Sequence, residues 1–348
     1  MRDKSTIKYS QIIAALEAEN LFISASRIDE QAEYSKIETD SRLIEKNDVF
    51  VCIKGFVSDG HAFAEKAFNN GAALFIVEKK LEQDYQQIVV KNYRKAAAVL
   101  GKLFFADPTS KFKLIGITGT NGKTTIASLT EEILRRNGKR TGLIGTLGFA
   151  INGSQYKSER TTPDIFDLNR IFEKMVEENV EFVVMEVSSH ALALDRVYGL
   201  HFDAALFTNL TQDHLDFHTD LQDYAEAKFK LFEQVQMNNG ISLLNIDDPV
   251  GKEFYNKIES NKYSISFDLA DFQIKECEFN LESSSFQLKF NQFQKLNSAP
   301  SYKESSREVS LNSAPLRKGR SREVSLNSAP LRKGRSREVS LNSAPLRK

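Results

Sequence analysis

The hydrophobic positions of this chain fall into short apolar runs that alternate with stretches of helical period. Residues 113–118 form an apolar run that predicts a buried strand, and residues 124–137 repeat apolar positions at helical spacing, which predicts a helix. Gly138 follows where a left-handed residue would end that helix. The side chains expected to face the core are Ile126, Leu129, Ile133 and Leu134.

The same alternation continues to about residue 247. Further strands are predicted at 141–147, 181–187, 204–210 and 241–247, with a helix near 221–234. Thr162-Pro163-Asp164 predicts one more helix, running to about residue 178, because a capping threonine, a proline and a first-turn acid follow in order. Strands that alternate with helices indicate a mostly parallel α/β sheet covered by helices. Ligands of such sheets bind beyond the carboxyl ends of the strands.

The first part of the chain has a shorter α/β pattern of its own. Residues 49–53 and 73–77 are predicted strands, and residues 61–69 between them form a predicted helix that stops at Asn70-Gly71. Asp107-Pro108-Thr109-Ser110 is typical of a linker. We therefore expect a small N-terminal α/β domain over residues 1–111 and a central domain over residues 112–295.

The tail, residues 296–348, is a basic repeat of 15 residues. Ser306–Arg320 recurs letter for letter as Ser321–Arg335 and again, up to the last residue, as Ser336–Lys348. The repeat is rich in serine and charge and offers little apolar surface to bury, so we expect the tail to be disordered. Duplication of coding DNA or a reading-frame error accounts for identical copies. A basic arm for nucleic acid or anionic lipid is the alternative.

Charge and composition limit the classes of function. The chain carries 47 basic and 47 acidic residues, but the tail alone has 12 basic and 4 acidic ones, so residues 1–295 are acidic by eight charges. An acidic body has no electrostatic footprint for nucleic acid. The polar start is no signal peptide, and no run of about 18 apolar residues exists to enter a membrane. Cys52 and Cys277 form no metal-ligand pattern, which is in keeping with a reducing cytoplasm.

The strongest chemical signal is the glycine-rich segment between the strand at 113–118 and the helix that follows it. Its backbone N–H groups can turn toward one phosphate, and the helix N-terminus favours an anion. The lysine would reach the β- and γ-phosphates of ATP, and the next hydroxyl would bind Mg²⁺. Ile117 departs from the strict phosphate-loop pattern, which has glycine there. The residues expected to bind ATP are Gly119, Thr120, Asn121, Gly122, Lys123, Thr124 and Thr125.

With that departure, Thr-Gly-Thr-Asn-Gly-Lys-Thr-Thr at 118–125 resembles the loop of Mur ligases and folylpolyglutamate synthetases. Glu-Val-Ser-Ser-His-Ala-Leu at 186–192 and Asp-His-Leu-Asp-Phe-His at 213–218 resemble the MurE type. Thr-Asp-Ser-Arg at 39–42 and Asp-Gly-His at 59–61 resemble that family's uridine-binding domain. The resemblance spans about residues 30–290. It implies a ligase of peptidoglycan precursor synthesis.

Three further residues are implied in metal binding. Glu186 ends an apolar strand at the ligand edge, where a carboxylate can hold Mg²⁺, although a solvated strand-end acid is the plainer interpretation. The resemblance makes His214 a ligand of a second Mg²⁺. It also makes Lys228, which on residue pattern alone is a solvated helical lysine, the carbamylated lysine of the family. The catalytic set is thus Lys123, Glu186, His214 and Lys228, with Thr124, Glu186, His214 and Lys228 on metal.

The resemblance also places the first substrate, UDP-MurNAc-L-Ala-D-Glu. Hydroxyls and a guanidinium fork suit its polar and anionic groups. Arg160 and Leu194 stand where the family has asparagine and glutamine, so no role is assigned to either. The segment 245–248 stays unassigned. The residues expected at this substrate are Ser41, Thr161, Thr162, Ser188 and Arg196.

The implied reaction is amide ligation through an acyl phosphate. ATP phosphorylates the D-glutamate side-chain carboxylate, and the amine of a diamino acid, meso-diaminopimelate or L-lysine, displaces the phosphate. The family's third domain and the Gly-x-Phe-Asn-x-x-Asn segment before it are not found after Phe290, so we expect a truncated chain with impaired activity. Two alternatives remain open: a folylpolyglutamate or cyanophycin synthetase, and a non-catalytic protein that binds nucleotide or UDP-sugar. The sequence predicts no oligomeric state.

Overall fold

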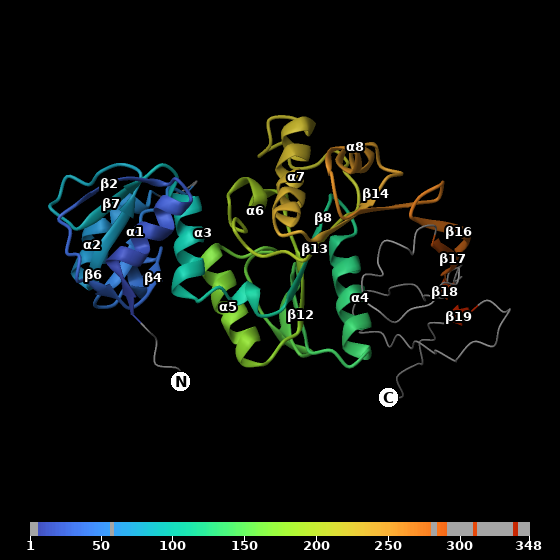
Figure 1. The fold of residues 1–348 in the computed structure, drawn as a ribbon, viewed down its shortest axis with the longest axis horizontal. Helices are drawn as coiled ribbons and strands as arrows, with labels where there is room; N and C mark the ends of the chain where they lie inside the picture. Colours follow the sequence, from blue (N-terminus) through green and yellow to red (C-terminus); the bar gives the residue numbers. More distant parts are fainter. Residues whose placement is uncertain (1–5, 56–58, 280–283, 291–308, 312–336, 340–348) are drawn as a thin grey trace.

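The computed structural model describes residues 6–55, 59–279, 284–290, 309–311 and 337–339. Figure 1 shows the described chain as two α/β units side by side, with the N-terminal unit in blue and the central unit from green to orange.

The N-terminal unit is a five-stranded sheet with helices packed on it. Its strand order is β2-β7-β6-β5-β4, in which β4 to β7 pair in parallel and β2 pairs antiparallel with β7. The strands are β2 (Phe22–Ser26), β4 (Ile37–Glu38), β5 (Asp48–Val51), β6 (Ala72–Val77) and β7 (Gln87–Val90). The helices are α1 (Tyr9–Ala18), α2 (Ala64–Asn70) and α3 (Tyr93–Phe104), and β1 (Ile7–Lys8) pairs with β3 (Glu33–Tyr34).

The central unit contains a larger sheet in which seven neighbouring strands run parallel. Its order is β11-β10-β9-β12-β8-β13-β14-β15-β16-β17-β18-β19, parallel from β9 to β16. The strands are β8 (Lys113–Thr118), β9 (Thr141–Gly145), β10 (Gly148–Ile151), β11 (Ser154–Tyr156), β12 (Phe182–Glu186), β13 (Ala204–Phe207), β14 (Ile241–Asn245), β15 (Lys262–Ser266), β16 (Phe272–Phe279) and β17 (Ser284–Phe290). The helices are α4 (Lys123–Arg136), α5 (Ile165–Glu177), α6 (Ser189–Ala193), α7 (Leu221–Met237) and α8 (Pro249–Lys257). The predicted mostly parallel sheet is confirmed.

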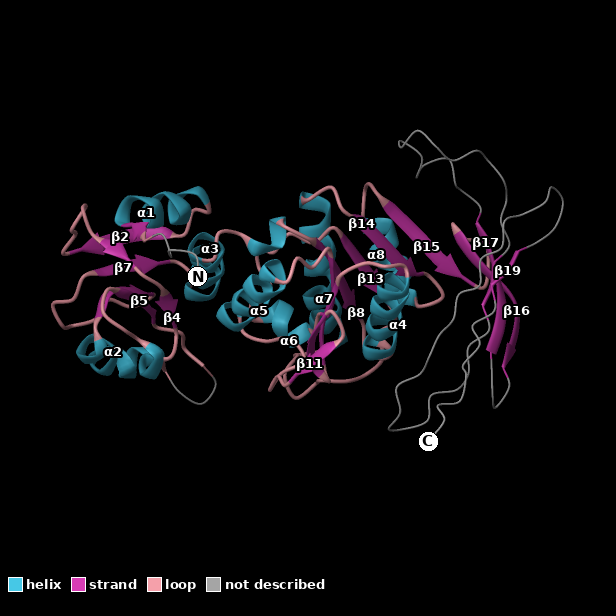
Figure 2. Ribbon diagram, turned by 90° about the horizontal axis from the view of Figure 1, so that it is seen from below, coloured by secondary structure: helices cyan, strands magenta, loops and turns pink. Residues whose placement is uncertain are grey.

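Helices cover both faces of the parallel strands. Ala127 of α4 packs on Ile117 and Val184 on one face, whereas a Cβ atom built on Gly116 would approach Leu231 of α7 on the other face. Figure 2 shows α4 and α5 on opposite sides of the strands. The absence of a side chain at Gly116 lets α7 and the Phe202 ring lie close to β8. This packing fixes β8, from which the glycine-rich loop emerges.

The predicted buried face of α4 is right for Ile126 and Leu134, which pack against the core, and wrong for Leu129 and Ile133. Leu129 is 42% exposed and Ile133 is 41% exposed, while Ala127 and Glu131 are the buried residues of the helix. Glu131 can face inward because its carboxylate accepts a hydrogen bond of 2.5 Å from the Thr141 hydroxyl. A satisfied polar residue therefore takes the inner position that hydrophobic periodicity assigned to leucine and isoleucine. Gly138, with φ of +77°, does follow the helix end as predicted.

The start of α5 also differs from the prediction. The helix begins at Ile165 after Asp164, whose side chain makes no capping hydrogen bond. Thr162 is not the N-cap, because its hydroxyl donates to the Glu186 carbonyl oxygen at 2.9 Å. Thr162 thus connects the segment before α5 to the end of β12.

Six residues of the repeat tail are described, and they form two short strands. β18 (Val309–Leu311) pairs antiparallel with β17, and β19 (Arg337–Val339) pairs with β18. The expected disorder of the tail stays a prediction. The remainder of residues 296–348 lies outside the described residues.

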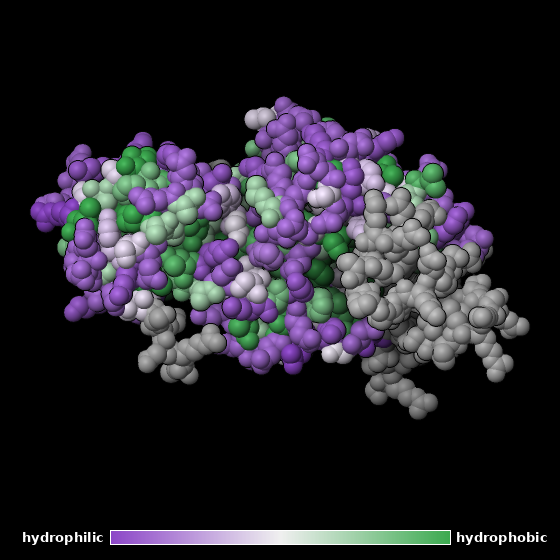
Figure 3. Space-filling model, in the orientation of Figure 1, coloured by the Kyte–Doolittle hydropathy of each residue, from purple (hydrophilic) through white to green (hydrophobic). Residues whose placement is uncertain are grey.

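The two units contact each other through α3 and α5 and through an ion pair. Arg170 of α5 binds the carboxylate of Glu38, at the end of β4. Most of the face seen in Figure 3 is hydrophilic, and smaller hydrophobic groups lie on both units. In the part of the chain that the structure describes, no helix is long and apolar enough to cross a membrane.

Candidate active site

The glycine-rich loop joins β8 to α4 and is held by the segment that follows β13. Gly119 has φ of +143°, and a Cβ atom built there would lie 1.9 Å from the Thr208 hydroxyl oxygen. That hydroxyl donates to the carbonyl oxygen of Asn121 at 2.7 Å, and the Asn121 N–H donates to the side-chain oxygen of Asn209 at 3.0 Å. Position 119 therefore requires glycine. Contacts with Thr208 and Asn209 hold the loop in addition to its own turn.

Lys123 begins α4 and points back over the loop. Its Nζ atom donates to the carbonyl oxygens of Gly119 and Thr120, both at 2.9 Å. Burial lowers the pKa of this lysine, and the negative charges of Glu186 and Asp213 oppose that shift. A partly buried ammonium at the N-terminus of a helix suits a phosphate chain.

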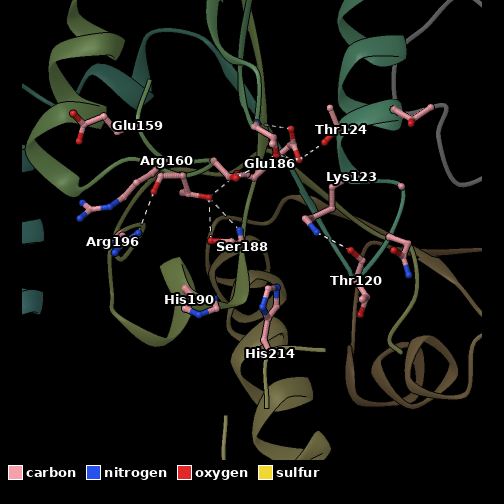
Figure 4. Close-up of a pocket in the computed structure, with 16 residues that line it drawn as sticks. Thr120, Lys123, Thr124, Glu159, Arg160, Glu186, Ser188, His190, Arg196 and His214 are labelled. Carbon is pink, nitrogen blue, oxygen red and sulfur yellow. Dashed lines mark hydrogen bonds between the residues drawn. The ribbon is translucent and has the colours of Figure 1, made fainter. Parts of the chain in front are cut away.

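Glu186 ends β12 and is only 2% exposed. Its Oε2 accepts hydrogen bonds from the hydroxyls of Thr124, at 2.8 Å, and Thr146, at 3.2 Å, and its Oε1 accepts from the Thr146 N–H at 2.8 Å. Figure 4 shows this carboxylate between the Lys123–Thr124 side and the Arg160–Ser188 side of the cavity. A buried carboxylate beside a hydroxyl is a set of hard oxygen donors, which fits Mg²⁺.

His190 and His214 lie on the same wall of the cavity (Figure 4). The rings of His190 and His214 meet edge to face with centroids 4.9 Å apart, and His190 also packs on Phe217. The pKa of His190 is lowered by burial and then by the charges of His214 and His218. His214 itself has φ of +54°, an unusual backbone conformation for histidine that functional loops often contain.

Lys228 lies in the middle of α7 and is 1% exposed. Its Nζ donates to the carbonyl oxygen of Gly119 at 2.9 Å and sits 4.3 Å from the centre of the Tyr224 ring. Burial, with the charge of Lys123 second, lowers its pKa to about 7. The plain expectation of a solvated helical lysine is therefore wrong, because this side chain points under the glycine-rich loop.

The residues expected to bind metal are only partly gathered. Thr124 and Glu186 are in direct contact, and His214 lines the same cavity, whereas Lys228 lies beneath the loop and does not line it. Among the described residues, no three His, Cys, Asp or Glu side chains lie close enough together to hold a metal ion. Two of the four expected ligands, Thr124 and Glu186, are thus in contact, and Lys228 is not gathered with them.

The opposite wall contains four of the five residues expected at the first substrate. Thr162 is 1% exposed, and its hydroxyl accepts from the Ser188 N–H at 3.1 Å, so it braces the wall. Arg196 pairs with Asp164 at 2.8 Å, and burial lowers its pKa. Ser41 lies apart in the N-terminal unit, 5% exposed, in a short 3₁₀ helix capped by Asp40.

These walls enclose a cavity of about 580 Å³. Of the residues predicted from sequence, Gly119, Lys228 and Ser41 do not line it. Sequence reasoning gave no role to four residues that do, namely Thr146, Glu159, Arg160 and His190. Thr146 follows the carboxyl end of β9, so the rule that ligands bind at that edge could have found it. The predicted residues that line the cavity are Thr120, Asn121, Gly122, Lys123, Thr124, Thr125, Thr161, Thr162, Glu186, Ser188, Arg196 and His214.

Comparison with known families identifies this arrangement. The profile of the Mur ligase middle domain matches residues 117–306, more than half of the chain, and that of the Mur ligase family catalytic domain matches residues 33–105. The chain belongs to the Mur ligase family. The predicted resemblance is confirmed, and the cavity lies within the part that matches the middle domain.

Several curated Mur ligases are similar to it. UDP-N-acetylmuramoyl-L-alanyl-D-glutamate–2,6-diaminopimelate ligase of Clostridium botulinum is 42% identical over 73% of this chain and 52% of its own length. The enzyme of the same name from Clostridium perfringens is 44% identical over 72% of this chain and 51% of its own. The chain thus spans about half the length of these Mur ligases.

Solved Mur ligase structures have the same fold. A structure of a UDP-N-acetylmuramoyl-L-alanyl-D-glutamate–2,6-diaminopimelate ligase superposes with a TM-score of 0.72 at 26% identity, covering 88% of this chain and 59% of that one. A MurF from Acinetobacter baumannii superposes with a TM-score of 0.57 at 21% identity, covering 88% and 61%. The second likeness concerns the fold alone.

Proposed function

We propose that this chain binds ATP and UDP-MurNAc-L-Ala-D-Glu in the cavity and serves an ATP-dependent ligase that adds a diamino acid. The curated relatives act, by their names, with 2,6-diaminopimelate, and we propose the same amine donor, with L-lysine as the alternative. The observation that carries the proposal is one cavity lined both by the glycine-rich loop with Lys123 and by the Ser188–Arg196 wall. A cytoplasmic location is part of the proposal, and Cys52 and Cys277 are both free thiols.

The loop side of the cavity binds the triphosphate. Backbone N–H groups at the N-terminus of α4 bind the phosphates, and Lys123 exchanges its two carbonyl partners for phosphate oxygens. That exchange favours binding, because a hydrogen bond to an anion is stronger than one to a neutral carbonyl. The buried position of Lys123 reinforces the attraction, because surrounding water screens it less.

Thr124 and Glu186 would hold one Mg²⁺, and His214 with a carbamylated Lys228 would hold a second. Bound there, Mg²⁺ would neutralise negative charge on the phosphates during transfer. Carbamylation joins the uncharged Lys228 amine to CO₂ and releases a proton, which replaces a cation by an anionic oxygen ligand. Support for this step comes from the pKa of about 7, which leaves much of the amine uncharged at neutral pH.

The ligation then has two steps. The D-glutamate side-chain carboxylate attacks the γ-phosphorus of ATP, which gives an acyl phosphate and ADP. The uncharged amine of the diamino acid attacks the acyl carbon, and phosphate leaves as the C–N bond forms. The chain's own residues place the two substrates: Lys123 holds the phosphates, and Ser188, Thr161 and Arg196 hold the anionic peptide end.

The test is phosphate release from ATP by the purified chain in the presence of meso-diaminopimelate, with and without UDP-MurNAc-L-Ala-D-Glu. We expect release that depends on the UDP-dipeptide and is lost in Lys123→Met. Lys79→Met, at an exposed position in the N-terminal unit, is the matched control and should behave as the wild type. If both ligands bind and no UDP-dipeptide-dependent phosphate appears, the chain is a binding protein and the catalytic proposal is wrong. Release stimulated by folate substrates instead would indicate a folylpolyglutamate synthetase.

A further inference from the structure

Thr146 contacts the Glu186 carboxylate twice, through backbone and side chain. Its N–H donates to Oε1 at 2.8 Å, and its hydroxyl donates to Oε2 at 3.2 Å. The two donors come from one residue and reach both oxygens of one carboxylate, so together they set the plane in which the carboxylate lies.

The backbone around Thr146 leaves the carboxylate little freedom. Gly145 and Gly148 are a cross-strand pair of β9 and β10, so Thr146 and Leu147 form a two-residue hairpin turn. A Cβ atom built on Gly145 would lie 2.1 Å from Oε1 of Glu186, and one built on Gly148 would lie 2.2 Å from the Tyr156 carbonyl oxygen. The turn therefore sits directly against the carboxylate and is itself held by β11.

The same hydroxyl connects the two sides of the cavity. The Thr146 Oγ1 atom lies 3.2 Å from the hydroxyl oxygen of Thr161, on the substrate wall. On the other side of Glu186, the Thr124 hydroxyl donates to Oε2 at 2.8 Å. Because Thr146 has one hydroxyl proton and gives it to Glu186, the proton between the two threonines must come from Thr161.

We propose that Thr146 is a positioning residue that orients Glu186 for the metal beside Thr124 and couples that orientation to Thr161. It acts through the carboxylate and does not itself bind metal. The inference rests on the proposed role of Glu186 as a magnesium ligand. Residues that orient a metal ligand in this way change metal affinity about 10- to 100-fold when they are removed.

The plain alternative is that Thr146 is only a turn residue. Thr146→Val and Thr146→Ser separate the two, because valine keeps the shape and the backbone N–H but loses the hydroxyl, whereas serine keeps the hydroxyl. A turn residue would lower thermal stability in both variants and leave metal affinity alone. A positioning residue would lower metal affinity in the valine variant and be rescued by serine.

The experiment measures Mn²⁺ binding to the full 348-residue chain in the presence of a non-hydrolysable ATP analogue, by electron paramagnetic resonance of free Mn²⁺. Nucleotide affinity in EDTA and the thermal midpoint are recorded for each variant. We expect Thr146→Val to weaken Mn²⁺ binding about 10-fold. Thr146→Ser should stay within about twofold of wild type, as should the metal-free nucleotide affinity of every variant. If the valine variant does not fold, Thr146→Ala takes its place under the same criterion.

Glu186→Gln distinguishes failure of this inference from failure of the proposed function. If Glu186→Gln loses Mn²⁺ and Thr146→Val binds it as tightly as wild type, the positioning role is overturned and the proposed magnesium ligand stands. If Glu186→Gln binds Mn²⁺ as wild type does, the proposed ligand role is wrong, and the role of Thr146 falls with it.

Discussion

The Nζ atom of Lys228 lies 2.9 Å from the carbonyl oxygen of Gly119, a residue 109 positions earlier in the chain. This contact brings the middle of α7 under the glycine-rich loop. Lys123 donates to the same carbonyl oxygen from above at 2.9 Å, so two lysines share one acceptor. Their mutual repulsion adds to burial in lowering the pKa of Lys228. An uncharged Lys228 relieves that repulsion and is also the form that reacts with CO₂.

The first prediction concerns the pH dependence of this modification. Its pKa of about 7 is well below that of a free lysine, so the uncharged fraction of Lys228 grows as the pH rises through 7. At constant dissolved CO₂, we expect incorporation of ¹³C-labelled CO₂ to rise several-fold from about pH 6 to about pH 8. Carbon NMR of the labelled protein measures it. Lys228→Met should lose the signal, and Lys230→Met, at an exposed position on the same helix, should keep it. A carbon NMR signal of the same size in Lys228→Met as in the wild type would contradict the prediction.

The second prediction compares two glycines that both have positive φ. In Gly119→Ala the new Cβ would lie 1.9 Å from the Thr208 oxygen, so the loop must move and we expect ATP affinity to fall at least 10-fold. Gly138 has φ of +77°, but nothing lies within 4 Å of a Cβ built there. Gly138→Ala should therefore cost about 1 kcal/mol of stability and leave ATP affinity unchanged. Calorimetric titration with ATP and thermal melts measure both, and equal ATP affinities in the two variants would contradict the account.

The third prediction concerns the link between the two units. Glu38 is 6% exposed, and burial raises its pKa even though Arg170 opposes the shift. Arg170→Met leaves that carboxylate buried without its partner, and we expect a loss of about 1–3 kcal/mol in the free energy of unfolding. Urea unfolding measures this loss, and Asp167→Asn is the control.

Asp167 binds the same arginine at 2.8 Å but is exposed, so its removal should cost less than about 0.5 kcal/mol. Combining Arg170→Met with Glu38→Leu should recover most of the loss, because an apolar pair no longer leaves a buried charge unpaired. Strictly additive effects of the two substitutions would show that the residues do not interact.

Much of the fold was predictable because the apolar runs of the central strands are uninterrupted. The strand predicted at 113–118 is β8 to the residue, and the other strands and helices predicted between residues 124 and 247 occur in the predicted order. The hairpin of β10 and β11 was missed, because residues 148–156 were assigned to no strand. The exposure of Leu129 and Ile133 on α4 has a different cause, because hydrophobic periodicity cannot foresee that Glu131 finds a hydroxyl partner inside.

The site was predictable where function lies in one continuous segment. Residues 120–125 line the cavity as expected, because a strand, a loop and a helix in sequence dictate their geometry. Lys228 could be found only through family resemblance, since no local pattern shows that a helical lysine points under a loop far away in sequence. Thr146 was missed for a related reason, because its importance depends on a contact with β12 across the sheet.

The most direct test of the central claim is calorimetric titration of the 348-residue chain with MgATP and, separately, with UDP-MurNAc-L-Ala-D-Glu. The account predicts that both ligands bind, that Lys123→Met loses MgATP alone, and that Arg196→Met weakens the UDP-dipeptide at least 10-fold while MgATP affinity is kept. Binding of neither ligand, or binding that Lys123→Met and Arg196→Met leave unchanged, would contradict the claim that one cavity holds both substrates.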